Sequence, residues 1–125
     1  MALCLIAGAV SAVLAVNSFT LAWMHSIERV RWEEDWRVVD GRQLQIVAAR
    51  IKGSGAGMEP PADAVLRDGA WHYRPPVAAM DSLTLAHSSY TQGYELCADG
   101  ACQTLTDYLP GIAASGTIIL TPCLE

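Results

Sequence analysis

The hydrophobic pattern of the first half of the chain has a period of two, which is typical of strands with one buried face. Two successive segments each place mainly aromatic and apolar side chains on one face. The first face carries Phe19, Leu21, Trp23 and His25, and the second carries Trp32, Glu34, Trp36 and Val38. We expect these segments to form a hairpin with a loop over residues 28–31. This register places Trp23 opposite Trp36 and His25 opposite Glu34.

Asp-Gly pairs mark further hairpins, because both residues tolerate the positive φ of a type I′ turn. Asp40-Gly41 predicts a following strand over residues 43–51, with Val47, Ala49 and Ile51 on the face of Trp32. Later short strands are expected at residues 71–73, 83–87, 94–97, 102–105 and 117–120. Residues 58–67 are compatible with a short helix, which Pro60-Pro61 disfavours.

The first twenty residues carry no charge and are rich in small apolar side chains. A signal peptide is one interpretation, but its usual cationic start is missing, and the first basic residue is Arg29. We favour an apolar hairpin that turns within residues 8–11. The apolar run is shorter than the roughly 20 residues that cross a bilayer, so we expect no membrane-spanning segment.

Length and composition favour one all-β domain over residues 1–125. A chain that is 52% hydrophobic supports one core of this size. Many short strands separated by Gly, Pro and Asp predict an antiparallel β-sandwich or open barrel of about 8–10 strands. The net charge of -5, with eight Lys and Arg residues, argues against nucleic-acid binding, which needs a basic surface.

The four cysteines allow two pairs. Asp99-Gly100 lies between Cys97 and Cys102, and a hairpin there sets these cysteines opposite each other, which predicts a disulfide. Cys4 and Cys123 would then join the first and last strands. The alternative is four reduced cysteines in a cytosolic protein. The missing cationic start slightly favours the cytoplasm, whereas paired cysteines favour the periplasm.

Ionisable groups and tryptophans share the region from Phe19 to Pro60, which makes it the candidate ligand pocket. The residues considered for this pocket are Trp23, His25, Glu28, Glu34, Trp36, Lys52, Gly55, Gly57 and Glu59. The glycines lack the spacing of a phosphate-binding loop and are explained by a turn, with a pocket-lining loop as the alternative. No spacing indicates a metal site, and no cofactor is expected.

The sequence offers one candidate pair of catalytic residues. His25 and Glu34 could act as acid and base if an apolar setting shifts their pKa values. The simpler interpretation is a buried polar contact without catalytic function. Glu33, Asp35 and Arg37 fall on the other face, where a solvated surface is expected. The tryptophans are most simply core residues, and ligand stacking is the alternative.

The chain resembles the bacterial family known as domain of unknown function 1850. The resemblance is carried by F-T-L-A-W-M-H-S-I-E, W-E-E-D-W and K-G-S-G-A-G-M-E-P, together with L-C-L near the start and a closing P-C. It implies a small protein of no assigned activity, often encoded near TRAP transporters of the TAXI kind. It supplies no catalytic residues.

Three functions are therefore open. We favour a non-enzymatic accessory or ligand-binding protein associated with TRAP/TAXI-type uptake, whose partners would be a small molecule or transporter components. The second is a small enzyme that uses His25 and Glu34. The third is a structural interaction domain, for example a homodimer that buries the tryptophan face.

Overall fold

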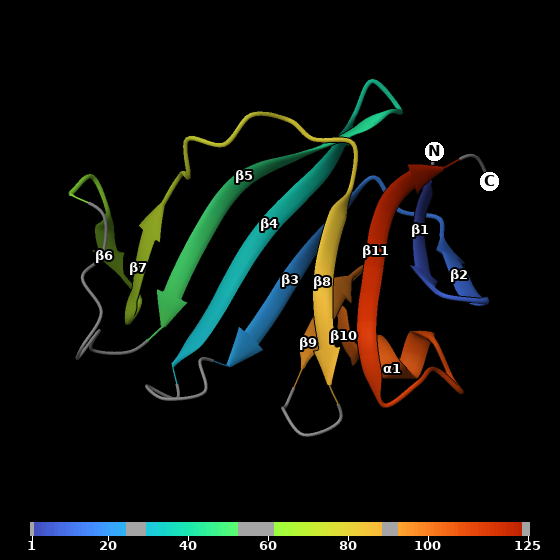
Figure 1. Cartoon of the computed structure of the whole chain (residues 1–125). Helices are drawn as coiled ribbons and strands as arrows, with labels where there is room; N and C mark the ends of the chain where they lie inside the picture. Colours follow the sequence, from blue (N-terminus) through green and yellow to red (C-terminus); the bar gives the residue numbers. More distant parts are fainter. Residues whose placement is uncertain (1, 25–29, 53–61, 89–92, 124–125) are drawn as a thin grey trace.

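The computed structural model describes residues 2–24, 30–52, 62–88 and 93–123, and it forms two antiparallel sheets that pack as an open sandwich (Figure 1). The first sheet has the order β2 (Val10–Leu14), β1 (Ala2–Ala7), β11 (Ser115–Cys123) and β8 (Leu83–Ser88). The second has the order β10 (Ala101–Thr104), β9 (Tyr94–Ala98), β3 (Ser18–Met24), β4 (Arg31–Val39), β5 (Gln43–Lys52), β7 (Ala70–Tyr73) and β6 (Val65–Arg67).

The expected all-β sandwich is confirmed, and neither sheet closes into a barrel. The described residues form eleven strands, slightly more than expected, and one short helix, α1 (Leu105–Tyr108). Thr104 caps this helix by accepting a hydrogen bond from the Asp107 backbone N–H, so the strand expected to reach Leu105 ends one residue earlier. Among the described residues, no helix has the length and apolar character to cross a bilayer.

Local turn signals predict the hairpins well. The Asp-Gly pairs at residues 40–41, 68–69 and 99–100 all have positive φ at both positions. The N-terminal hairpin is also present, with Ala7 opposite Val10 across a turn at Gly8. The expected helix over residues 58–67 is wrong where it is described, because the turn at Asp68-Gly69 folds residues 65–67 onto β7 as strand β6.

The register of β3 and β4 differs from the expected one. Trp23 lies opposite Trp32, and Glu34 lies opposite Leu21, so the expected pairing of Trp23 with Trp36 is wrong. The last pair of these strands within the described residues is Met24 with Arg31. The two registers differ by four residues, and a shift by an even number keeps every side chain on its face, so the hydrophobic pattern does not distinguish them.

A bulge in β5 places Val47 differently from the sequence-based expectation. Asp35 pairs with Ala48, but Trp36 pairs with Ile46, which leaves Val47 unpaired. Ile46, rather than Val47, is therefore the partner of Trp36, and it is 2% exposed. Ala49 and Ile51 pair with the Trp32 face as expected.

Both candidate cysteine pairs form disulfides, and each disulfide joins two neighbouring strands of one sheet. Cys4–Cys123 joins β1 to β11, and Cys97–Cys102 joins β9 to β10 across the Asp99-Gly100 turn. Such bonds persist in oxidising surroundings. They indicate a non-cytosolic compartment. This agrees with the periplasm expected for paired cysteines and not with the cytoplasm.

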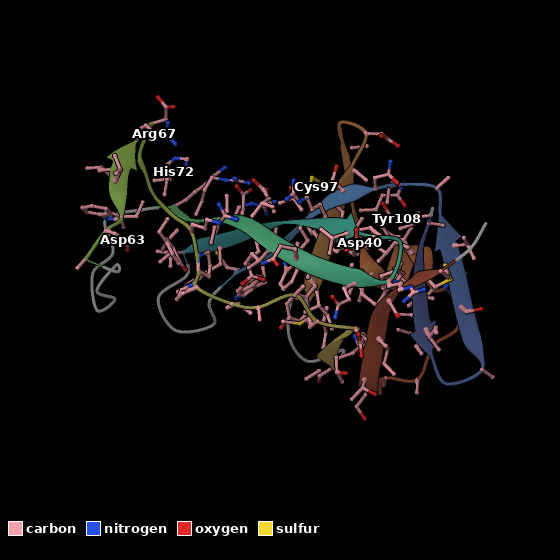
Figure 2. The ribbon with its side chains drawn as sticks, turned by 90° about the horizontal axis from the view of Figure 1, so that it is seen from above. Asp40, Asp63, Arg67, His72, Cys97 and Tyr108 are labelled. Atoms are coloured by element: carbon pink, nitrogen blue, oxygen red, sulfur yellow. A yellow bond between two sulfur atoms is a disulfide. The ribbon has the colours of Figure 1, made fainter. Side chains whose placement is uncertain are left out.

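The core fills only one end of the larger sheet. Its buried members are Leu3, Leu5, Phe19, Leu21, Trp36, Val38, Leu44, Ile46, Leu96, Leu105, Leu109, Ile118 and Leu120, none of which lies on β6 or β7. In Figure 1, β7 and β6 continue past the four-stranded sheet. Seen from above in Figure 2, Arg67 and His72 lie at the end of the molecule away from Tyr108. Part of the inner face of the seven-stranded sheet therefore extends beyond the core.

Candidate functional site

Strand pairing aligns large apolar side chains in a row across six strands of the larger sheet. In order from β9 through β3, β4, β5 and β7 to β6, the row consists of Tyr94, Trp23, Trp32, Ile51, Trp71 and Leu66. Directly opposite residues share a face, so all six lie on the inner side of the sheet. We call this set the aromatic row.

Three members of the aromatic row touch one another. The rings of Trp23 and Trp32 are stacked, with centroids 6.0 Å apart and an interplanar angle of 14°. Tyr94 contacts the other side of this pair, with its ring centroid 5.5 Å from that of Trp23 at a tilt of 57°. All three rings are half-buried, whereas Leu66 at the far end is 57% exposed. The row thus runs from the core to solvent.

Glu34 is the only charged side chain in the neighbouring row, which comprises Leu96, Leu21, Glu34, Ala49 and Tyr73. Its Oε1 atom accepts a hydrogen bond of 3.2 Å from Trp36 Nε1. None of the ion pairs formed by the described residues involves Glu34. Among the described residues, this carboxylate therefore lies near aromatic rings and has an indole N–H, and no cation, as its partner.

The pKa values in this region follow from that arrangement. Burial raises the pKa of Glu34 above its usual value, and the hydrogen bond from Trp36 opposes this only in part. Burial also raises the pKa of Tyr73 and of Tyr94, and the charge of Glu34 adds to both shifts. Glu34 is thus electrostatically coupled to a tyrosine on each side of it.

The outer face of the same sheet is built differently. Arg31 bridges Glu33 and Glu95 at 2.8 and 2.7 Å, and Arg50 bridges Glu33 and Asp35 at 3.0 and 2.6 Å. Glu33 is only 9% exposed. The expectation of a simple solvated surface is therefore wrong for Glu33 and Asp35, because Arg31 on β4 and Arg50 on β5 pair with them.

The structure brings together only some of the predicted pocket residues. Trp23, Glu34 and Trp36 share the inner face. Lys52 does not join them, because its Nζ atom lies 3.6 Å from Glu33 Oε2 on the outer face. The predicted His25, Glu28, Gly55, Gly57 and Glu59 lie outside the described residues. The expected placement of His25 opposite Glu34 is wrong, because Glu34 pairs with Leu21 on β3.

Two tyrosines near Glu34 were not predicted as site residues. Tyr73 and Tyr94 reach this region only through the pairing of β7 with β5 and of β9 with β3. Their alternation within short strands indicates an inward face, but nothing local indicates which strand is the neighbour. Trp71, expected as core or as a stacking residue, joins the aromatic row for the same reason.

A cavity of about 390 Å³ adjoins the aromatic row at Tyr94. It lies between the two sheets near α1, and its polar lining includes His87, Ser88, Thr104 and Thr106. Leu105 and Ile118 supply apolar walls from the core. Tyr94 thus contacts both this partly open cavity and the ring of Trp23.

Comparison with known proteins identifies the family but not an activity. No curated protein and no solved structure matches the chain. A family described as Domain of unknown function (DUF1850) matches residues 19–105, which includes the strands that carry Trp23, Trp32, Glu34 and Tyr94. The protein therefore belongs to the DUF1850 family.

Proposed function

We propose that this protein is a non-enzymatic ligand-binding accessory of TRAP/TAXI-type solute uptake and that it acts in the periplasm. The observation that carries the ligand-binding part is the aromatic row beside Glu34. Small-molecule sites are commonly lined by aromatic side chains and a few oriented polar groups. Here half-buried stacked rings lie beside one carboxylate that is oriented by a hydrogen bond. The link to transport rests on the family resemblance, and the two disulfides support the periplasm.

An enzymatic function has less support. The described part of the inner face offers one carboxylate, Glu34, and its hydrogen-bond partner is an indole that does not exchange protons in catalysis. General acid–base chemistry relies on titratable groups within hydrogen-bond reach of the reacting atoms, and often combines an acid with a base. Binding requires no such group, and it is therefore the function that the described geometry favours.

A structural interaction domain is the second candidate, and the edge strand β6 favours it. Val65 and Leu66 are 56% and 57% exposed on a strand that pairs on one side only. An open edge with apolar side chains can pair with another chain. This strand is only three residues long, which limits the surface that it offers.

A ligand screen tests the proposed function. The purified, oxidised protein is screened against organic acids, amino acids, sugars and small cations by thermal shift and tryptophan fluorescence. We expect at least one compound to give a saturable stabilisation, about 2.7 kcal/mol at a hundredfold excess over Kd. The effect should weaken in Trp32→Leu, which removes the stacked ring and keeps an apolar side chain.

Arg37→Ala is the matched control, because Arg37 is exposed on the outer face of the same strand. It should bind as the wild-type protein does. If no compound shifts the melting temperature, or if every hit survives Trp32→Leu unchanged, the ligand-binding proposal fails. A stable dimer in sedimentation would then move the interpretation to the interaction domain.

A further inference from the structure

We infer that the aromatic row and Glu34 bind a small organic cation, with a quaternary ammonium group that carries a nearby oxygen acceptor as the best fit. This inference rests on the proposed ligand-binding function and specifies the chemical class of the ligand. Three features of the described residues support it: the unpaired charge of Glu34, the stacked rings beside it, and a buried indole N–H without a partner.

The first argument is charge complementarity. On the outer face, the carboxylates of Glu33, Asp35 and Glu95 each have an arginine within hydrogen-bond distance. On the inner face, Glu34 has none within the described part of the chain. A half-buried carboxylate without a cation is unfavourable unless it is protonated or a ligand supplies the charge. An organic cation beside Glu34 would give this carboxylate the kind of charged partner that arginines give the carboxylates on the outer face.

The second argument comes from the rings. The face of an indole carries negative electrostatic potential, and it attracts ammonium groups within about 6 Å of its centroid. Trp23, Trp32 and Tyr94 form a continuous aromatic surface in which neighbouring centroids are 5.5 to 6.0 Å apart. Tyr73 lies on the same inner face of the sheet, two strands from Glu34. Methylated ammonium groups suit such a surface because they are weakly hydrated and present no N–H groups that must be satisfied.

The third argument specifies the rest of the ligand. Trp32 Nε1 is buried and has no hydrogen-bond partner among the described residues. A buried donor is normally paired, so this N–H favours a ligand with an oxygen acceptor. A hydroxyl or carboxylate oxygen a few atoms from the ammonium group would meet it. Choline and glycine betaine are the simplest compounds of this kind, and both are available as probes.

The experiment separates the contribution of the ligand's shape to binding from the contribution of its charge. Choline, glycine betaine and 3,3-dimethylbutan-1-ol are titrated into the oxidised full-length chain at pH 7.5 and followed by calorimetry. The butanol derivative has the shape of choline with carbon in place of the charged nitrogen. We expect saturable binding of choline or betaine, with the neutral isostere at least tenfold weaker. Glu34→Gln should weaken the cation at least tenfold.

Glu34→Gln keeps an oxygen that can accept from Trp36 and should stay folded, which its thermal melt verifies. Asp40→Asn is the matched control, since it removes the same charge from an exposed turn with φ of 53° that Asn also tolerates. It should leave binding unchanged. A second readout is pH: cation affinity should fall on acidification, starting above the usual range for Glu. Tyr73 and Tyr94, which also face Glu34, stay neutral there.

The outcomes separate the inference from the function on which it rests. If the neutral isostere binds as tightly as choline and Trp32→Leu abolishes this, ligand binding stands and the cation inference is overturned. Glu34→Gln that binds choline with wild-type affinity also overturns it. If neither these probes nor the broader screen produces binding, both proposals are wrong.

Discussion

Glu33 and Glu34 are neighbours in the chain, but they lie on opposite faces of β4 and their pKa values shift in opposite directions. Burial alone would raise the pKa of both carboxyl groups. For Glu33, hydrogen bonds from Arg31 and Arg50 outweigh burial, so its pKa is lowered. For Glu34 the indole of Trp36 is too weak a partner, and burial dominates. One carboxylate is therefore held by arginines, and the other has an indole as its partner among the described residues.

Arg50→Ala tests the structural role of the outer face. Arg50 donates to Glu33 and to both carboxylate oxygens of Asp35, and its loss leaves Glu33 buried with less compensation. The groups are partly exposed, so we expect a loss of about 2 kcal/mol in the free energy of unfolding, below the value for fully buried pairs. Urea unfolding at pH 7 measures it.

The same variant has a predicted pH dependence. Hydrogen bonds from Arg50 lower the pKa of Asp35, and those from Arg31 and Arg50 lower that of Glu33. A lowered folded-state pKa contributes stability at neutral pH that is lost as pH falls below about 4. The difference between wild type and Arg50→Ala should therefore shrink in acid. Arg37→Ala, on the same face, should stay within about 0.5 kcal/mol at every pH; an equal loss would contradict the role of Arg50.

At the scale of the elements, local signals are sufficient for hairpins but not for the order of strands in a sheet. Asp40-Gly41 and Asp99-Gly100 specify their turns because both positions need positive φ. The pairing of β9 with β3 and of β11 with β1 joins distant segments, and no local pattern encodes it. The sequence therefore predicts that Trp23 and Glu34 share a face, but not that Tyr94 and Tyr73 complete it.

Gly69→Ala tests whether the β6–β7 hairpin is an independent unit. Gly69 has φ of 77° with open space around it, so the change adds backbone strain only, about 1 kcal/mol. Neither strand contributes to the main core cluster, and the one buried residue described on them is the small Ala70. We expect faster hydrogen exchange in residues 65–73 with little change in global stability.

Gly41→Ala provides the comparison, since Gly41 has φ of 65° and turns the chain between β4 and β5. Both of these strands carry core residues, such as Trp36 and Leu44. Similar strain there should lower the global free energy of unfolding by about 1 kcal/mol. Equal global losses for the two variants would show that the β6–β7 hairpin unfolds together with the core.

At the scale of the whole molecule, the two sheets differ in width, and this difference creates the candidate site. The four-stranded sheet covers the core end of the seven-stranded sheet, and β7 and β6 extend past it (Figure 1). The aromatic row begins beside the core with Tyr94 and Trp23 and ends at exposed Leu66. The aromatic row and the hydrophobic core are thus two parts of one sheet face, so changes at Trp23 should affect both.

The two disulfides should differ in their contribution to stability. A cross-link stabilises mainly by limiting the unfolded chain, and the effect grows with the length of the loop. Cys4–Cys123 spans 119 residues, whereas Cys97–Cys102 spans five. Replacing both cysteines by serine should cost about 4–5 kcal/mol for the first pair and about 2 kcal/mol for the second. Urea unfolding without reductant measures both losses. A larger loss for the short loop would refute this ordering.

The Cys4–Cys123 bond also changes what a protease can do to this protein. With residues 4 and 123 bonded, nearly the whole chain is a covalent ring. A single cut anywhere in the ring opens it without releasing a fragment, and the strands on both sides of the cut stay tethered. Only a second cut, or reduction, would detach a piece. In a compartment where proteases act on exposed loops, a nicked molecule would therefore keep its two sheets within reach of each other.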